Sequence, residues 1–201
     1  MIRILKITLA VGVGVLATSC ASFSNNRLPK IASSPASGAK KVPLTYSLTS
    51  RAETLNGLHK ETVSTSNERS EGPLTTALTN SGRFSSVSRG KGGSVHLDLE
   101  LLNYGNHGAA AVSGFISGFS FLTIPAFATD NYKLTATAST ASGKSRQYVL
   151  DEGVTTVIWL PLIVTAPFSN PMTVTPKVQE NMYRNLIEKM ESDGLISKAG
   201  N

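Results

Sequence analysis

The alternation of apolar and polar residues predicts a β-sheet. Over residues 95–102 every second residue is apolar, which is the period of a strand with one buried face. The same alternation covers residues 42–49. Two more strand patterns, residues 132–140 and 145–150, flank the sequence Ala-Ser-Gly-Lys, a typical hairpin turn. We therefore expect a mixed or antiparallel sheet of about four to five strands.

Two segments repeat apolar residues with the period of a helix. The first, residues 73–80, has Leu74, Ala77 and Leu78 on one face, with Ser70 placed to cap its start and Gly82 at its end. The second, residues 176–192, carries a longer stripe: Val178, Met182, Leu186, Ile187 and Met190. The order of these segments predicts an α+β fold, a single domain with two main helices on one face of the sheet.

Two stretches of the chain carry no formal charge. The first is 29 residues long, between Glu100 and Asp130, and contains a 20-residue apolar run at 109–128. The second is 24 residues long, between Glu152 and Lys177, and centres on residues 154–168. Because the two stretches flank the predicted hairpin symmetrically, both could emerge from the same end of the sheet.

Three structures are compatible with these stretches. They could be buried core, or an apolar flap of hairpin-like insertions that contacts the bilayer or a neighbouring subunit. They could also be transmembrane helices, since the first run is long enough to cross a bilayer. A large exposed apolar patch would mark an interface. The residues that we expect to make such a membrane or partner contact are aromatic: Phe115, Phe119, Phe121 and Trp159.

The amino terminus has the pattern of a secretory signal peptide. Arg3 and Lys6 precede an apolar run of about ten residues, and small residues follow it. The junction between Ser19 and Cys20 resembles the lipobox of bacterial lipoproteins, which are cut before a diacylated cysteine. The resemblance implies cleavage there and lipidation of Cys20, and Ala21 after it implies sorting to the outer membrane. Plain secretion or an uncleaved anchor are the alternatives, although the run is short for a spanning helix.

This pattern predicts the domain organisation. Residues 1–19 are the expected signal peptide, and residues 20–41, rich in Ser, Ala, Asn and Pro, are the expected lipidated tether. We expect a periplasm-facing α/β domain over residues 42–195, with both uncharged stretches inside it, and a tail over residues 196–201.

Composition excludes several classes of function. Cys20 is the only cysteine, so its acylation leaves no thiol for a disulfide, a metal or a nucleophile. Loss of Arg3 and Lys6 lowers the formal charge from +6 to +4, which is too small and too scattered to indicate nucleic-acid binding. No catalytic or metal-ligating constellation is visible, and His96 and Asp98 fit the solvated face of a strand. We expect a protein that is not an enzyme and needs no cofactor.

One pattern resembles a known group. The sequence LTTALTNSGRFSSV at residues 74–87, followed by a strand, a Gly-turned hairpin and a final helix, is similar to small envelope lipoproteins whose α/β domain is like the amino-terminal domain of TolB. That group includes regulators of peptidoglycan synthases and ring-forming accessory lipoproteins of export machines. The resemblance covers about residues 42–192 and brings no catalytic residue across, because these relatives act by binding partners.

The resemblance implies a non-enzymatic assembly or accessory factor of an envelope or export complex, with an envelope protein as its partner. Two other functions remain compatible with the uncharged stretches. One is a homo-oligomeric ring or pore component that inserts into the bilayer, and the other is a carrier that shields an apolar ligand.

Overall fold

The computed structural model describes most of the chain after the expected signal peptide: residues 20–32, 41–56, 59–65, 68–105, 107–164 and 166–197. The predicted signal peptide at 1–19 lies outside the described residues. So do residues 33–40 of the predicted tether and the end of the predicted tail.

The described strands form one mixed sheet of seven strands, where the sequence predicted about four to five. They are β1 (Cys20–Ser24), β2 (Val42–Asn56), β3 (His59–Thr65), β4 (Phe84–Arg89), β5 (Val95–Gly105), β6 (Ala126–Thr140) and β7 (Ser145–Ile158). Their order is β1-β7-β6-β5-β2-β3, and β4 also pairs with β2. Strand β2 is parallel to β4 and β5 and antiparallel to β3, while β1 and β7 are antiparallel.

The sequence did not predict β1, β3 or β4, and two of these, β1 and β3, lack an apolar alternation for a physical reason. The described side chains of β3, residues 61–65, are all exposed, so no face of that strand selects apolar residues. Strand β1 is short and buries only small side chains, Ala21 and Ser22.

The helices confirm the α+β class. They are α2 (Glu68–Asn80), α3 (His107–Phe119), the single turn α4 (Ala166–Ser169) and α5 (Pro171–Ser192), with a 3-10 helix, η1 (Leu160–Val164). The first uncharged stretch therefore contains the end of β5, helix α3 and the start of β6, so the apolar insertion there includes a helix. Its Ala-rich beginning favours a helix over a strand.

The described chain divides into two compact units. The described residues of unit 1 lie within 20–25, 106–130 and 154–175, and those of unit 2 lie within 26–105, 131–153 and 176–197. Strands β6 and β7 run from one unit into the other. Cys20 and most of both uncharged stretches thus belong to unit 1.

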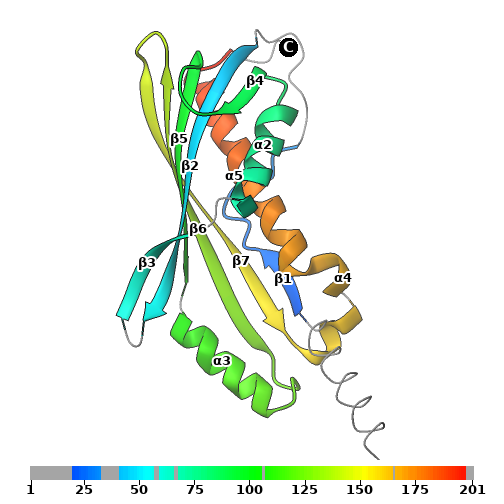
Figure 1. Ribbon diagram of the computed structural model, residues 1–201. Coiled ribbons are helices and arrows are strands. Elements are labelled where there is room, and N and C mark those ends of the chain that lie inside the picture. The colour runs from blue at the N-terminus through cyan, green and yellow to red at the C-terminus, as the bar shows by residue number, and fades with distance from the viewer. Residues whose placement is uncertain are drawn as a thin grey trace, which may run out of the picture. The chain divides into compact units, whose positions relative to one another are not determined.

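Unit 2 has the core that the sequence predicted. In the β2–β5 pair, Leu44 lies beside Val95 and Leu48 beside Leu99, and all four side chains are buried. Figure 1 shows α2 and the main part of α5 along the same side of these strands. The predicted helical stripes are buried on both helices: Leu74, Ala77, Leu78, Val178, Met182, Leu186, Ile187 and Met190.

The ends of α2 show one confirmed and one corrected prediction. Gly82 follows the helix with a φ of 68°, the left-handed conformation that suits glycine, as expected. Ser70 does not cap the start, because the helix begins two residues earlier, at Glu68. Ser70 is instead buried inside the first turn.

Candidate membrane-contacting surface

Cys20 is the first residue of β1. Its Cα pairs with that of Ile158 near the end of β7, and the ladder continues to Ser24 and Val154. Between the two strands, the hydroxyls of Ser22 and Thr156 are 2.8 Å apart. Partial burial raises the pKa of the free Cys20 thiol above its ordinary value. The expected lipidation site is therefore part of the folded unit 1, while Ser19, on the other side of the expected cleavage point, lies outside the described residues.

Hydrogen bonds join the two uncharged stretches within unit 1. Directly after Ile158, the indole Nε1 of Trp159 donates to the carbonyl oxygen of Thr123 over 3.1 Å. The main-chain N–H of Leu160 donates to the carbonyl of Leu122, also over 3.1 Å. The end of β7, which pairs with Cys20, is thereby fixed to the turn that follows α3.

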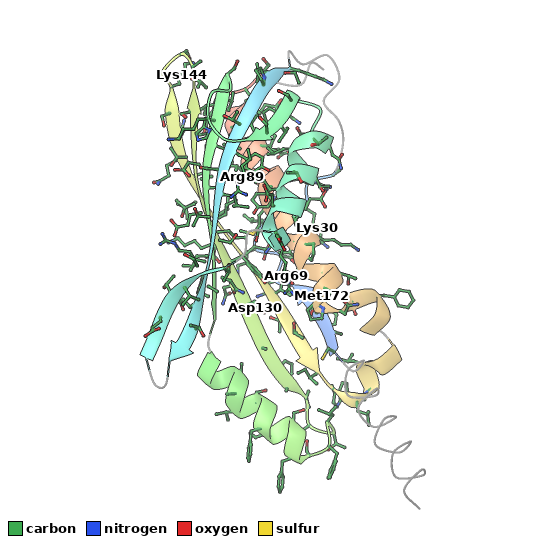
Figure 2. The ribbon with its side chains drawn as sticks, viewed as in Figure 1. Lys30, Arg69, Arg89, Asp130, Lys144 and Met172 are labelled. Atoms are coloured by element: carbon green, nitrogen blue, oxygen red, sulfur yellow. The ribbon has the colours of Figure 1, made fainter. Side chains whose placement is uncertain are left out.

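Helix α3 turns its large apolar side chains to solvent. Val112, Phe115 and Phe119 are 62%, 75% and 83% exposed, whereas Ser117 is buried. The hydroxyl of Ser113 accepts a hydrogen bond of 2.7 Å from the main-chain N–H of Phe127 in β6. A surface helix of a soluble protein has the opposite arrangement, with apolar residues inward and polar residues outward. Large side chains project away from α3 in Figure 2.

The turn after α3 continues this exposure. Phe121 and Leu122 both have positive φ angles, 53° and 62°, a conformation that is uncommon for bulky residues. The N–H of Leu122 closes the helix by donating to the carbonyl of Ser117 over 2.8 Å. As a result, the Leu122 side chain is buried and the Phe121 ring is 85% exposed.

The exposed large apolar side chains of the described residues concentrate in unit 1. Twelve of fourteen lie there, and only Val63 and Val149 lie in unit 2. We call the following set the apolar surface of unit 1: Phe23, Val112, Phe115, Ile116, Phe119, Phe121, Ile124, Phe127, Trp159, Leu160, Phe168 and Met172. Unit 1 from residue 20 onward contains one residue with a formal charge, Asp130, which is labelled in Figure 2 together with Met172.

All four aromatic residues that the sequence singled out belong to this surface. Phe115 and Phe119 stack on each other with ring centroids 6.4 Å apart. Phe121 and Trp159 are also exposed. Sequence reasoning missed Phe23 because it assigned residues 20–41 to a tether, although its position three residues after Cys20 was a usable signal.

The exposure of these side chains argues against a buried core, the first of the three structures considered for the uncharged stretches. Most of the large apolar side chains of these stretches that the structure describes lie at the surface. Within the described part of the chain, no helix combines the length and the apolar character needed to cross a membrane.

Residues 26–32, which the sequence assigned to the tether, are hydrogen-bonded to other parts of unit 2. The carboxylate of Glu152 is 1% exposed and accepts three main-chain N–H bonds. Its Oε1 accepts from Arg27 at 3.1 Å and from Gly153 at 2.8 Å, and its Oε2 accepts from Leu28 at 3.1 Å. A buried carboxylate is stable when hydrogen bonds replace its water, and here the amino-terminal segment supplies two of them.

Helix α5 holds the same segment through its polar face. Asn181 Oδ1 accepts from the N–H of Ile31 at 2.9 Å, and the side-chain amides of Asn181 and Asn185 both donate to the carbonyl of Pro29 at 3.0 Å. We call residues 26–32 the strap. Its contacts use main-chain groups, which every residue possesses, so its polar composition gave no sign of them.

The polar side chains of unit 2 pair with one another. Tyr46 donates to Glu71 over 2.7 Å, and burial followed by this hydrogen bond raises the pKa of Tyr46 to about 12. Tyr148 donates to Asp193 over 2.9 Å, and the same two causes raise the pKa of Tyr148 to about 12. Both phenols therefore stay protonated donors at neutral pH.

The strand face with His96 and Asp98 is also paired. The Thr45 hydroxyl lies 3.0 Å from His96 Nδ1, and Ser47 donates to Asp98 over 2.6 Å. Among the described residues, no group of three or more His, Cys, Asp or Glu side chains is placed to hold a metal ion.

Comparison with known proteins gives structural matches of low identity and low TM-score. No family model and no curated protein matches the sequence. A Xanthomonas campestris protein of family DUF330 is 10% identical with a TM-score of 0.42, covering 83% of this chain and 94% of its own. A minor lipoprotein from Acinetobacter baumannii is 11% identical with a TM-score of 0.33, covering 79% and 96%. The PelC dodecamer from Paraburkholderia phytofirmans is 10% identical with a TM-score of 0.25, covering 79% and 97%.

These similarities are too low to assign the chain to a family. The resemblance to the amino-terminal domain of TolB stays a prediction. The functional argument therefore rests on the residues of this chain.

Proposed function

We propose that the chain is a lipid-anchored lipoprotein of the outer membrane, facing the periplasm, which acts as a non-enzymatic accessory factor of an envelope complex. One observation carries the proposal. Cys20, at a lipobox-like junction, begins a strand of the unit that has almost no charge and most of the exposed apolar side chains.

The position of Cys20 suits a lipid anchor. Lasting attachment to a bilayer needs two or more acyl chains, and a processed lipobox cysteine carries them. Because β1 pairs with β7 directly from Cys20, the acyl chains would be joined to a folded element without an intervening linker. Unit 1 would then lie against the lipid surface.

Unit 2 supports the binding role. Strand β3 pairs with β2 at the end of the strand order, and its described side chains are exposed. Such an edge can accept a further strand from a partner through main-chain hydrogen bonds. The tyrosines and carboxylates of this unit serve in structural pairs, as in Tyr46–Glu71 and Tyr148–Asp193, which favours a binding protein over an enzyme.

Lipidation is tested by the intact mass of the protein purified from bacterial membranes. We expect residue 20 to be the first residue and to carry a diacylglyceryl group and a further acyl chain, and we expect the protein in the outer-membrane fraction of a density gradient. Cys20→Ala should remove the lipid mass, whereas Ser24→Ala, in the same strand, should keep it. An unmodified Cys20 in the wild-type protein would contradict the proposal.

The accessory role is tested by photo-crosslinking in living cells. A photoreactive residue at Val63, on the β3 edge, should give one dominant adduct with an envelope protein. The same residue at Ser142, in the exposed β6–β7 hairpin turn, is the control and should not. If the purified wild-type protein alone processed peptidoglycan or another envelope polymer, the non-enzymatic assignment would be wrong.

A further inference from the structure

We propose that the outward face of α3 and the turn after it insert into the interfacial layer of the bilayer, as a membrane contact separate from the acyl chains of Cys20. This inference rests on the proposed lipid anchor and adds to it a protein surface that enters the lipid. The inserted side chains are Phe115, Phe119 and Phe121, with Trp159 beside them.

The inverted arrangement of α3 is the first argument. Its inner side is made of small residues, with Ser113 bound to the main chain of β6 and Ser117 buried. Its outer side exposes Phe115 and Phe119 to an extent that water disfavours. Contact with an apolar medium would remove these two rings from water and stabilise the bound form.

The location of Cys20 identifies that medium as lipid. Cys20 pairs with Ile158, the next residue is Trp159, and Trp159 is hydrogen-bonded to the turn that carries Phe121. The acyl chains and the exposed rings are therefore attached to the same unit. Lipid is therefore the apolar medium that the anchor brings nearest to the rings.

The chain around the anchor allows little reach. Residues 20–24 are paired in β1, and the strap begins two residues later at residue 26. A flexible linker after Cys20 would let unit 1 leave the membrane surface, but residues 20–24 are paired with β7. The anchor thus keeps unit 1 close to the lipid.

The dimensions of α3 indicate insertion without crossing. The helix has 13 residues and so is about 20 Å long, shorter than the hydrocarbon layer of about 30 Å. An indole whose ring is partly exposed and whose N–H is bonded, as in Trp159, is typical of the lipid–water interface.

The charge distribution predicts how membrane binding depends on lipid charge and salt. Unit 1 from residue 20 onward has no Lys or Arg, so it offers no cation to lipid phosphates. Peripheral helices that bind through cations depend on anionic lipid and weaken in salt. Binding by α3 should instead depend on neither the headgroup charge nor the salt concentration.

The experiment uses residues 20–201, the mature chain of the proposed lipoprotein, with Cys20→Ser so that no lipid is attached. The probes are vesicles of phosphatidylcholine and vesicles of phosphatidylethanolamine with phosphatidylglycerol. Trp159 is the only tryptophan, so its emission reports directly on unit 1. We expect a blue shift and flotation with both kinds of vesicle, unchanged in high salt.

Two variants locate the contact. Phe119→Ser combined with Phe121→Asn removes two exposed rings, and asparagine suits the positive φ at 121. This double variant should lower the partition coefficient by about tenfold or more. Phe115→Ser alone should lower it less. Val149→Ser removes an exposed apolar side chain of unit 2 and should leave the partition coefficient unchanged.

The outcomes separate this inference from the proposed function. If the unlipidated chain binds neither kind of vesicle, or if the Phe variants and Val149→Ser bind with equal affinity, the insertion is overturned. The lipid anchor still stands in that case, provided that the cell-derived protein carries the acyl mass at Cys20. Light scattering could instead show that the chain forms an oligomer without lipid. If the Phe variants were then monomeric and Val149→Ser stayed oligomeric, the surface would bind a second copy, and the inference would be overturned.

Discussion

Helices α5 and α3 show how one type of sequence pattern leads to two different surfaces. Both carry apolar residues at helical spacing. In α5 the apolar stripe is buried, with Met182 and Leu186 almost inaccessible, and charged residues such as Glu188 face solvent. In α3 the apolar side chains face solvent and the serines face inward.

The difference lies in the residues opposite the apolar ones. Charged side chains on α5 define its outer face, because they need water. Helix α3 has no charged residue, and its small serines allow close approach to β6, where Ser113 bonds to the main chain. Apolar spacing therefore predicts a helix, but charge and side-chain size determine which face the fold covers.

The largest contrast should appear when one side chain is shortened on each helix. Leu186→Ala removes a buried side chain and should lower the free energy of unfolding by about 2–5 kcal/mol. Phe119→Ala removes a larger side chain that is 83% exposed and should change it by no more than about 0.5 kcal/mol. Urea unfolding of both variants measures this. A large loss for Phe119→Ala would mean that the ring is covered in the isolated protein.

Two glycines allow the same comparison between a packed site in unit 2 and the exposed face of α3. A Cβ at Gly93 would lie 2.8 Å from the N of Thr45 and 2.9 Å from the O of Val95, so Gly93→Ala should cost about 1–3 kcal/mol. A Cβ at Gly114 in α3 meets nothing within 4 Å, so Gly114→Ala should stabilise by about 0.5–1 kcal/mol. Thermal unfolding of the two variants should shift in opposite directions. Destabilisation by Gly114→Ala would show that its face of α3 is packed.

Release of the strap tests how firmly the segment after the anchor is held. Glu152→Gln replaces one accepting oxygen by an NH2 group that cannot accept a main-chain N–H, and should cost about 1–3 kcal/mol. Hydrogen exchange at Arg27 and Leu28 should become faster. The control Glu188→Gln changes an exposed carboxylate of α5 and should alter neither quantity. Unchanged exchange in Glu152→Gln would show that α5 alone holds the strap.

Ionisation of the tyrosines should affect the free energy of unfolding only at high pH. The folded protein raises the pKa of Tyr46 and Tyr148 from 10.0 to about 12, which favours their neutral form. Their contribution to stability is therefore complete below pH 10 and is lost as the pH rises toward 12. All five tyrosines lie in unit 2. Tyrosinate absorbance should report unit 2 while Trp159 emission reports unit 1, and Tyr148→Phe should reduce the alkaline loss.

Much of unit 2 could be predicted from the sequence. The alternation in β5 and the stripes of α2 and α5 identify buried faces, because burial of apolar side chains repeats with the geometry of strand or helix. The hairpin between β6 and β7 followed from its turn residues, and Gly143 there has a φ of 85°. The sequence also established the two uncharged stretches and the single cysteine, Cys20.

Only the tertiary structure decided how that uncharged sequence is used. An apolar residue is equally compatible with core, interface or lipid, so the exposure of Phe115 and Phe121 depends on which neighbours the fold supplies. The strap is a second case, because Glu152 and Asn181 bind main-chain groups that carry no sequence signal. Pairing of β1 with β7 brought Cys20 into the same unit as the exposed rings, since a contact between residues more than 130 positions apart is set by the fold of the whole chain.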